Sequence, residues 1–210
     1  NHRKMKVERL PYFPSYVRQK SFLSCGILLD DVSNYVLLYN VAGVQKNGSY
    51  HKGLNGFFEE EDMLQVPLTV LTKLSRLESP DQTLYIDENP SVFAARCMSY
   101  PESACMCMNG QPKLAALVAL ELFAASGTKV YYSGDFDPEG LWIAQRLAYF
   151  YPGKFEFLNM DTECYEKCIS DEPISDVRLK QLERITDERL LGAVLMMRRE
   201  KKSGYQEGIL

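Results

Sequence analysis

The chain has 210 residues, of which 46% are hydrophobic and 25% are charged, and its formal net charge at neutral pH is −4. A chain of this length can bury a core without disulfide or metal staples, and its sequence lacks the apolar run of about 18 residues that a membrane-spanning helix needs. The acidic balance argues against a protein that grips nucleic acid through its own charge, but it suits an enzyme that meets phosphate through metal ions held by carboxylates.

The first 80 residues show mixed patterns and predict an N-terminal extension that packs on a core at residues 81–210. The chain begins with Asn1 rather than Met, which predicts a fragment of a longer protein. Within the extension we expect a basic arm at 1–20, followed by two apolar segments at 25–29 and 35–41 on either side of a turn at 30–34. These two segments are either both strands or a strand and a helical turn. After them we expect a glycine-rich and acidic surface loop at 43–62 and an amphipathic helix at 67–77.

One pattern occurs three times in the core: an apolar strand, a tight polar loop, and a helix with proline at its first position. Proline suits that position because its missing N–H would be unpaired there in any case. Alternating strands and helices predict an α/β fold with a parallel sheet flanked by helices. The expected strands are 83–87, 104–108, 128–133 and 154–158, and the expected helices are 90–98, 112–125 and 138–150, followed by two C-terminal helices at 174–185 and 187–202.

Carboxylates stand in two of the loops that follow these strands. In a parallel sheet such loops meet at one edge, where ligands bind, so we expect Glu88 to lie close to Asp135 and Asp137. Oxygen ligands at this spacing suit Mg²⁺, and two such ions would clamp the attacking and leaving oxygens of a phosphodiester displacement. Asp137 also precedes Pro138 and suits a helix N-cap, so the spacing alone leaves capping and metal binding open.

The cysteines and histidines favour no other chemistry. The six cysteines lack the paired spacing of a zinc site, which predicts reduced, buried thiols in a cytoplasmic protein. His2 and His51 are the only histidines, which disfavours histidine-based triads. If the chain is an enzyme, carboxylates are therefore expected to carry the catalysis.

Three segments together resemble a known family: IDENPSVFAA at 86–95, NGQPKLAALVAL at 109–120 and GDFDPEGLWIA at 134–144. An isolated glutamate after one strand and D-x-D-P after a later strand resemble the Toprim domain of topoisomerases, primases and nucleases, and the A subunit of type-IIB topoisomerases in particular. The full set most resembles the Toprim domain of the nuclease subunit of Wadjet plasmid-defence systems. The resemblance covers about residues 83–160.

This resemblance implies a metal-dependent DNA endonuclease domain with a Toprim (Rossmann-like) fold. Glu88, Asp135 and Asp137 would be the catalytic residues and the ligands of Mg²⁺ or Mn²⁺. Asn109, Gly110 and Lys113 are candidates for contacts with phosphate or DNA, although a loop followed by a surface lysine explains these three residues equally well. The implied partners are double-stranded DNA and the subunits of an SMC-like motor complex in the cytoplasm, with no membrane. The nucleophile would be water or a tyrosine from another domain, and the fragment alone is expected to be inactive.

Two other functions stay open at this point. One is a Toprim-like module that docks on DNA or on its complex without cutting. The other is a phosphatase of the haloacid-dehalogenase type, which also places D-x-D after a strand, but which needs that motif near the first strand and further motifs after it. The oligomeric state is open as well, with a homodimer among the alternatives.

Overall fold

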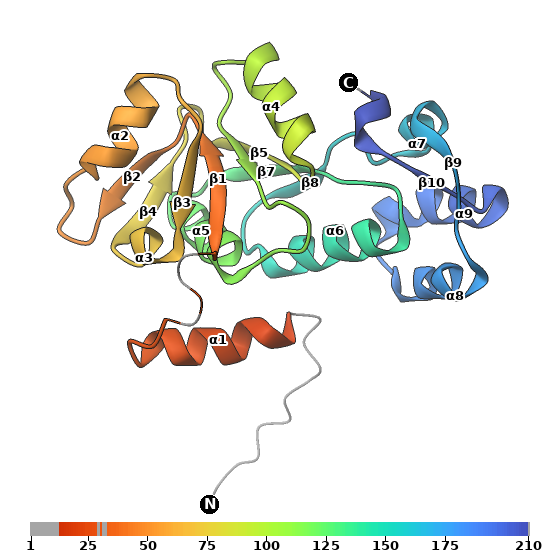
Figure 1. Cartoon of the computed structure of the whole chain (residues 1–210), viewed down its shortest axis with the longest axis horizontal. Helices are drawn as coiled ribbons and strands as arrows, with labels where there is room; N and C mark the ends of the chain where they lie inside the picture. The colour runs from red at the N-terminus through yellow and green to blue at the C-terminus, as the bar shows by residue number, and fades with distance from the viewer. Residues whose placement is uncertain (1–12, 29, 31–32, 210) are drawn as a thin grey trace, which may run out of the picture.

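The computed structural model describes residues 13–28, 30 and 33–209 and shows an α/β fold built on a central six-stranded sheet (Figure 1). In spatial order the strands are β3 (Leu64–Pro67), β1 (Tyr35–Tyr39), β6 (Cys105–Cys107), β5 (Thr83–Asp87), β7 (Lys129–Ser133) and β8 (Phe155–Phe157). The last four run parallel, as a Rossmann-like sheet requires, whereas β1 is antiparallel to both of its neighbours. β1 and β3, from the predicted extension, thus continue the same sheet.

Helices cover both faces of the sheet. On one face lie α5 (Leu114–Ala124) and α6 (Pro138–Phe150), which form the main core with the buried side chains of β5, β6 and β7. On the other face lies α4 (Pro90–Ser99), whose Phe93 and Cys97 pack against Cys105 and Cys107. These three cysteines are buried free thiols, as predicted, and so are Cys164 and Cys168, whereas Cys25 is exposed, contrary to the prediction. The four strands and three helices predicted between residues 83 and 158 are confirmed, with proline at the start of α4 and α6. The predicted start of α5 at Pro112 was wrong, because the helix begins at Leu114 after its N-cap Lys113.

The predictions between residues 43 and 78 were wrong. The expected loop contains a strand, β2 (Ala42–Gln45), and a helix, α2 (Lys52–Glu59). The expected helix at 67–77 is a single helical turn, α3 (Leu68–Leu71), followed by strand β4 (Leu74–Glu78), which pairs with β2. The register of that pair shifts opposite Val44 and Gln45. A bulge of this kind puts residues three apart on one face, so Leu74 and Leu77 are both buried and imitate helical spacing.

The start of the described chain is helical rather than an extended arm. Helix α1 (Pro14–Ser24) packs on α5, where Tyr16 and Lys20 both contact the carboxylate of Glu121. Residues 25–28 form no strand. The rest of the predicted arm, at 1–12, and residues 29, 31 and 32 of the predicted strand and turn lie outside the described residues.

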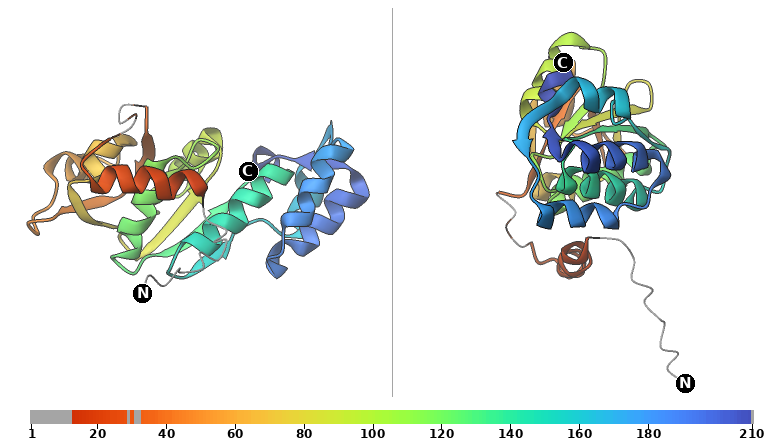
Figure 2. Two further views of the ribbon diagram at one scale, coloured as in Figure 1. Left: turned by 90° about the horizontal axis from the view of Figure 1, so that it is seen from below. Right: turned by 90° about the vertical axis from the view of Figure 1, so that its right-hand side faces the viewer.

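Residues 161–209 form what we call the C-terminal lobe, which lies beyond α6 in the left view of Figure 2 and faces the viewer in the right view. Its elements are α7 (Thr162–Cys168), β9 (Ile169–Pro173), α8 (Asp176–Leu179), the 3-10 helices η1 (Lys180–Arg184) and η2 (Glu188–Leu190), α9 (Leu191–Glu200), β10 (Lys202–Gly204) and the 3-10 helix η3 (Gln206–Ile209). The predicted helices at 174–185 and 187–202 are therefore shorter and interrupted, and the β9–β10 pair was not predicted. Within the described ranges, no helix is long and apolar enough to cross a membrane.

Candidate functional site

The three carboxylates predicted as a site lie together at the carboxyl edge of the sheet. β5 and β7 are adjacent and parallel, with Asp87 in register with Ser133. The two chains therefore leave the sheet side by side, and the backbone N–H of Glu88 donates to the carbonyl oxygen of Ser133 at 3.2 Å. The negative charges of Asp135 and Asp137 both act on Glu88, as its raised pKa shows below.

Two glycines let the chain turn tightly around these carboxylates. A Cβ at Gly134 would lie 3.0 Å from Oε2 of Glu88 and 2.7 Å from the hydroxyl oxygen of Tyr132. A Cβ at Gly140, in the first turn of α6, would lie only 2.4 Å from the carbonyl oxygen of Asp135. Glycine at both positions is thus a consequence of close packing, and it explains why the D-x-D segment starts and ends with glycine.

Phe136, between the two aspartates, anchors the loop to the C-terminal lobe. Its side chain is fully buried and meets the ring of Tyr165 edge-on, with 5.5 Å between ring centroids. Its backbone N–H and C=O both bond to Gly204, at 2.8 and 2.9 Å. Asp135 and Asp137 on either side stay partly exposed. The alternation turns two carboxylates toward the edge of the sheet while the residue between them fixes the loop.

The site holds more negative charge than its surroundings neutralise. Burial, followed by the charges of Asp135 and Asp137, raises the pKa of Glu88 to about 7, although the Tyr132 hydroxyl donates to its Oε2 at 3.3 Å. Burial also raises the pKa of Asp135 and of Asp137. Carboxylates that share a partly buried site repel one another when ionised, so a bound cation would relieve this strain.

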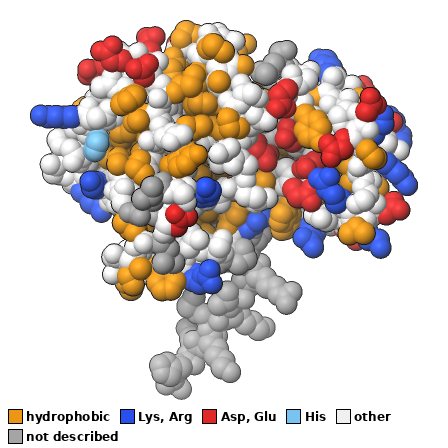
Figure 3. All heavy atoms as spheres, in the orientation of Figure 1, with side chains coloured by type: hydrophobic (Ala, Val, Ile, Leu, Met, Phe, Trp, Pro, Cys, Tyr) orange, Lys and Arg blue, Asp and Glu red, His pale blue; other side chains and the backbone are white. Residues whose placement is uncertain are grey.

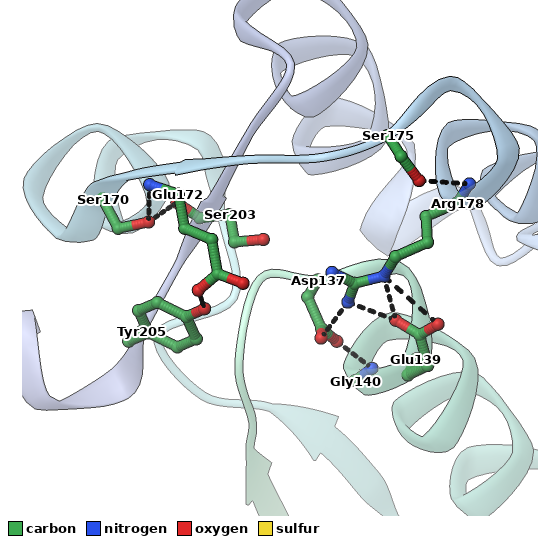
Figure 4. Close-up of polar contacts among 9 residues, drawn as sticks. All are labelled: Asp137, Glu139, Gly140, Ser170, Glu172, Ser175, Arg178, Ser203 and Tyr205. Atoms are coloured by element: carbon green, nitrogen blue, oxygen red, sulfur yellow. Dashed lines mark hydrogen bonds and ion pairs between the residues drawn. The ribbon is translucent and has the colours of Figure 1, made fainter.

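Asp137 is already engaged by the protein through both carboxylate oxygens (Figure 4). Its Oδ1 accepts a hydrogen bond from the backbone N–H of Gly140 at 2.6 Å, which makes it the N-cap of α6. Its Oδ2 accepts from the guanidinium of Arg178 at 2.7 Å, and the same guanidinium pairs with Glu139 at 2.6 Å. Within the described residues, no three His, Cys, Asp or Glu side chains form a set that could hold a metal ion.

Asp135 is bound by the last residues of the C-terminal lobe. The backbone N–H of Gln206 donates to its Oδ1 at 2.9 Å, and the Gln206 amide donates to Oγ of Ser133 at 2.8 Å. Glu207 next to it accepts from Nδ2 of Asn89 at 2.6 Å, and its charge contributes to the raised pKa of Asp135. Sequence reasoning missed Gln206, Glu207 and Arg178, because none of them follows a strand predicted from the sequence or belongs to a recognised motif.

The predicted phosphate contacts divide into two groups. Asn109 and Gly110 have left-handed backbone conformations, with φ of 55° and 82°, and the N–H of Gly110 donates to the carbonyl oxygen of Glu88 at 3.2 Å. They therefore lie beside the carboxylates. The ammonium of Lys113 instead donates to the carbonyl oxygen of Ser33 at 3.0 Å and lies 5.6 Å from the ring centroid of Tyr35, which begins the strand two places from β5.

A buried ion pair supports the strand end that carries Glu88. Asp87 is fully buried and accepts two hydrogen bonds, at 2.7 and 2.8 Å, from the guanidinium of Arg96 on α4. Removal of one partner of such a pair leaves an uncompensated buried charge and costs about 3–5 kcal/mol. The pair therefore fixes the end of β5 to α4 directly next to Glu88.

The side chains fit a divalent cation in their chemistry, although they are not arranged as a three-residue metal cluster and Arg178 occupies Asp137. Mg²⁺ takes one or two carboxylates together with water and substrate oxygens, and Glu88, Asp135 and Asp137 are carboxylates at a place where negative charge is in excess. Acidic side chains also gather on the surface where the sheet meets the C-terminal lobe (Figure 3). A cation that takes Asp137 as a ligand beside Glu88 and Asp135 would compete with Arg178 for Oδ2 of Asp137, since Oδ1 caps α6.

Comparison with known protein families identifies the family of most of the chain. Residues 64–210, more than two thirds of the chain, match a family model described as "Protein of unknown function C-terminus (DUF2399)". No curated protein matches the chain. The matched segment contains the whole site, from Glu88 on β5 to Glu207 in the C-terminal lobe.

Proposed function

The chain belongs to this family of unknown function, DUF2399, and from its site we propose a metal-dependent centre of the Toprim type that cuts phosphodiester bonds in DNA. The observation that carries the proposal is the meeting of Glu88, Asp135 and Asp137 at the carboxyl ends of the adjacent parallel strands β5 and β7. The resemblance of residues 83–160 to Toprim nucleases supports it independently of this geometry.

In this proposal Glu88, Asp135 and Asp137 would hold Mg²⁺ or Mn²⁺, which would supply charge neutralisation at the phosphate and activate water for attack. The chain's own residues provide the rest. Without metal, burial and the two aspartates raise the pKa of Glu88 to about 7. With the metal bound, Glu88 would be a ligand and the acid or base, with its pKa set by the metal. The Tyr132 hydroxyl orients this carboxyl, and the Asn109–Gly110 turn fixes its backbone.

The setting of the reaction follows from the resemblance to the Wadjet nuclease subunit. We propose double-stranded DNA as the substrate and an SMC-like motor complex as the partner. In the presence of such a complex the DNA would be delivered to the site, so the acidic chain would not need to capture it through its own charge. Hydrolysis by a metal-activated water is the simplest reaction that the carboxylates alone support.

Metal binding by the chain tests this proposal without any need for cleavage. We expect Mn²⁺, followed by electron paramagnetic resonance, to bind the wild-type protein, and Asp135→Asn to weaken this binding by at least about tenfold, because it removes one ligand charge. Asp171→Asn, which neutralises an exposed aspartate of the C-terminal lobe, is the matched control and should bind like wild type. A wild-type chain that binds no Mn²⁺ at millimolar concentration would refute the metal centre.

The engagement of Asp137 by Arg178 favours a second candidate, a Toprim-like module that docks on DNA or on its complex without cutting. Plasmid cleavage by the complete complex separates the two functions. The nuclease proposal predicts that Asp135→Asn abolishes cleavage while the complex still assembles. Unchanged cleavage by the assembled variant complex would leave only the docking role.

A further inference from the structure

Arg178 links the C-terminal lobe to the aspartate loop. It lies on α8, a helix of four residues that buries none of its side chains, and Oγ of Ser175 caps this helix by accepting from the Arg178 N–H at 3.4 Å. The guanidinium extends from this exposed helix to Asp137 and Glu139, as Figure 4 shows. The Arg178 side chain is 31% exposed, and that of Asp137 is 22% exposed.

The two contacts of Asp137 differ in how easily they can be exchanged. The Gly140 N–H on Oδ1 belongs to the backbone of α6, so its loss would unravel the start of that helix. The guanidinium on Oδ2 belongs to a flexible side chain on an unburied helical turn, and it keeps a second partner in Glu139 when it leaves Asp137. Oδ2 is therefore the atom of Asp137 that another cation can take.

We propose that Arg178 is an internal cation that closes the Asp137 side of the site and that a divalent ion must displace. This inference rests on the proposed function, because it concerns the regulation of the same metal centre. When the ion binds, the guanidinium gives up Asp137 and stays on Glu139. The C-terminal lobe thereby controls access to the site, since Arg178 contacts Asp137 and Gln206 contacts Asp135.

The affinity for Mn²⁺ is the measurement that tests this arrangement. Arg178→Gln removes the competing cation, and we expect it to tighten Mn²⁺ binding on the order of tenfold. A change of this size is what the loss of one charge-assisted, partly exposed contact would give. Arg178→Lys keeps the charge but loses the planar fork that spans two carboxylates, so it should bind with intermediate affinity. Arg199→Gln, which removes an exposed arginine paired with Glu200, controls for the change in net charge.

A second measurement follows the guanidinium itself. The Nε–H signal of Arg178, assigned by its absence in Arg178→Lys, should shift in nuclear magnetic resonance spectra as Mg²⁺ is added to the wild-type protein. The same titration in Asp135→Asn should shift it only at higher Mg²⁺ concentration. This readout needs neither DNA nor a partner complex, and it reports on the contact that the inference concerns.

The possible results separate this inference from the proposed function. If Arg178→Gln binds Mn²⁺ no more tightly than wild type, the metal centre stands but Arg178 does not close it. If Arg178→Lys binds Mn²⁺ with the same affinity as wild type while Arg178→Gln binds it more tightly, the positive charge at position 178 weakens binding only by long-range repulsion. That result would refute displacement of the guanidinium from Asp137. If neither wild type nor Arg178→Gln binds Mn²⁺, the metal centre falls and this inference falls with it.

Discussion

Among the three carboxylates of the site, Glu88 has its pKa raised to about 7 by burial and by the charges of the other two. It lies at the end of a buried strand, next to the Asp87–Arg96 ion pair, and faces two further carboxylates. Its pKa of about 7, against an ordinary value of 4.5, is raised first by burial and then by Asp135 and Asp137. A residue that is unfavourable for folding in this way is typical of a functional site.

The raised pKa gives a prediction for stability against pH. Between about pH 4.5 and 7, Glu88 is protonated in the folded chain but ionised in the unfolded chain. Relative to high pH, protonation of Glu88 therefore stabilises the folded state fully below pH 4.5, and this stabilisation is lost as the pH rises through 7. Glu88→Gln imitates the protonated form at every pH. We expect it to increase the free energy of unfolding by about 2 kcal/mol at pH 8 and to have little effect at pH 4.5, measured by urea denaturation in EDTA.

The control for this prediction is Glu156→Gln, on the exposed residue of β8, which should change stability equally little at both pH values. Addition of Mg²⁺ at pH 8 should stabilise the wild-type protein, because a cation bound to the folded state offsets the repulsion among the three ionised carboxylates. The stability of Glu88→Gln should be nearly unchanged by Mg²⁺, because this variant lacks the Glu88 charge. A Glu88→Gln variant that is less stable than wild type at pH 8 in EDTA would show that the carboxylate is not under strain.

At the scale of elements, the sequence predicted the part of the fold in which local signals agree. Each strand from residue 83 onward ends at a polar loop, and Asn89 and Asp137 cap the helices that follow. Because parallel strands meet at one edge, the position of Glu88 beside Asp135 followed from this pattern alone. The prediction for the segment before residue 83 failed because a bulge in β4 places Leu74 and Leu77, three residues apart, on the same buried face. This spacing is the one expected for a helix.

The start of α6 provides a prediction at the same scale. Gly140→Ala would normally favour a helix by up to about 1 kcal/mol, but here its Cβ would lie 2.4 Å from the carbonyl oxygen of Asp135. We expect it to destabilise the protein by about 2 kcal/mol and to weaken Mn²⁺ binding, because the aspartate loop must shift. Thermal unfolding and electron paramagnetic resonance measure the two effects.

Gly56→Ala is the matched control, because Gly56 lies in α2 and its added Cβ would meet nothing within 4 Å. This variant should be stabilised by about 0.5–1 kcal/mol, as helix propensity alone predicts, and should bind Mn²⁺ like wild type. If Gly140→Ala behaved in the same way, the tight packing of α6 against Asp135 would not be required for the site.

At the scale of the whole molecule, the site depends on residues that are distant in sequence. Arg178 is separated from Asp137 by 41 residues and Gln206 from Asp135 by 71. No local sequence pattern predicts either contact, because the two partners are so far apart in the chain. Whether the salt bridge and the backbone hydrogen bond form depends on how the C-terminal lobe packs against the aspartate loop. The sequence therefore predicted the carboxylates that meet at the site but not the groups that contact them.

The distribution of charge over the molecule gives the last prediction. The net charge is −4, and acidic side chains gather where the sheet meets the C-terminal lobe (Figure 3). DNA phosphates would be repelled there unless divalent ions intervene. In fluorescence anisotropy with a labelled DNA duplex, we expect the chain to bind more weakly than about 10 μM in EDTA at roughly 0.1 M salt, and to bind measurably more tightly with Mg²⁺.

Asp135→Asn distinguishes a metal bridge from simple screening of the repulsion. If Mg²⁺ acts through the site, this variant should lose most of the gain that Mg²⁺ gives, whereas Asp171→Asn, with the same change in charge on an exposed side chain, should keep it. Equal gains in both variants would mean that Mg²⁺ only screens the acidic surface. Tight binding in EDTA that weakens steeply with salt would instead reveal a basic contact surface, because release of counterions is the signature of phosphate contacts by lysine and arginine.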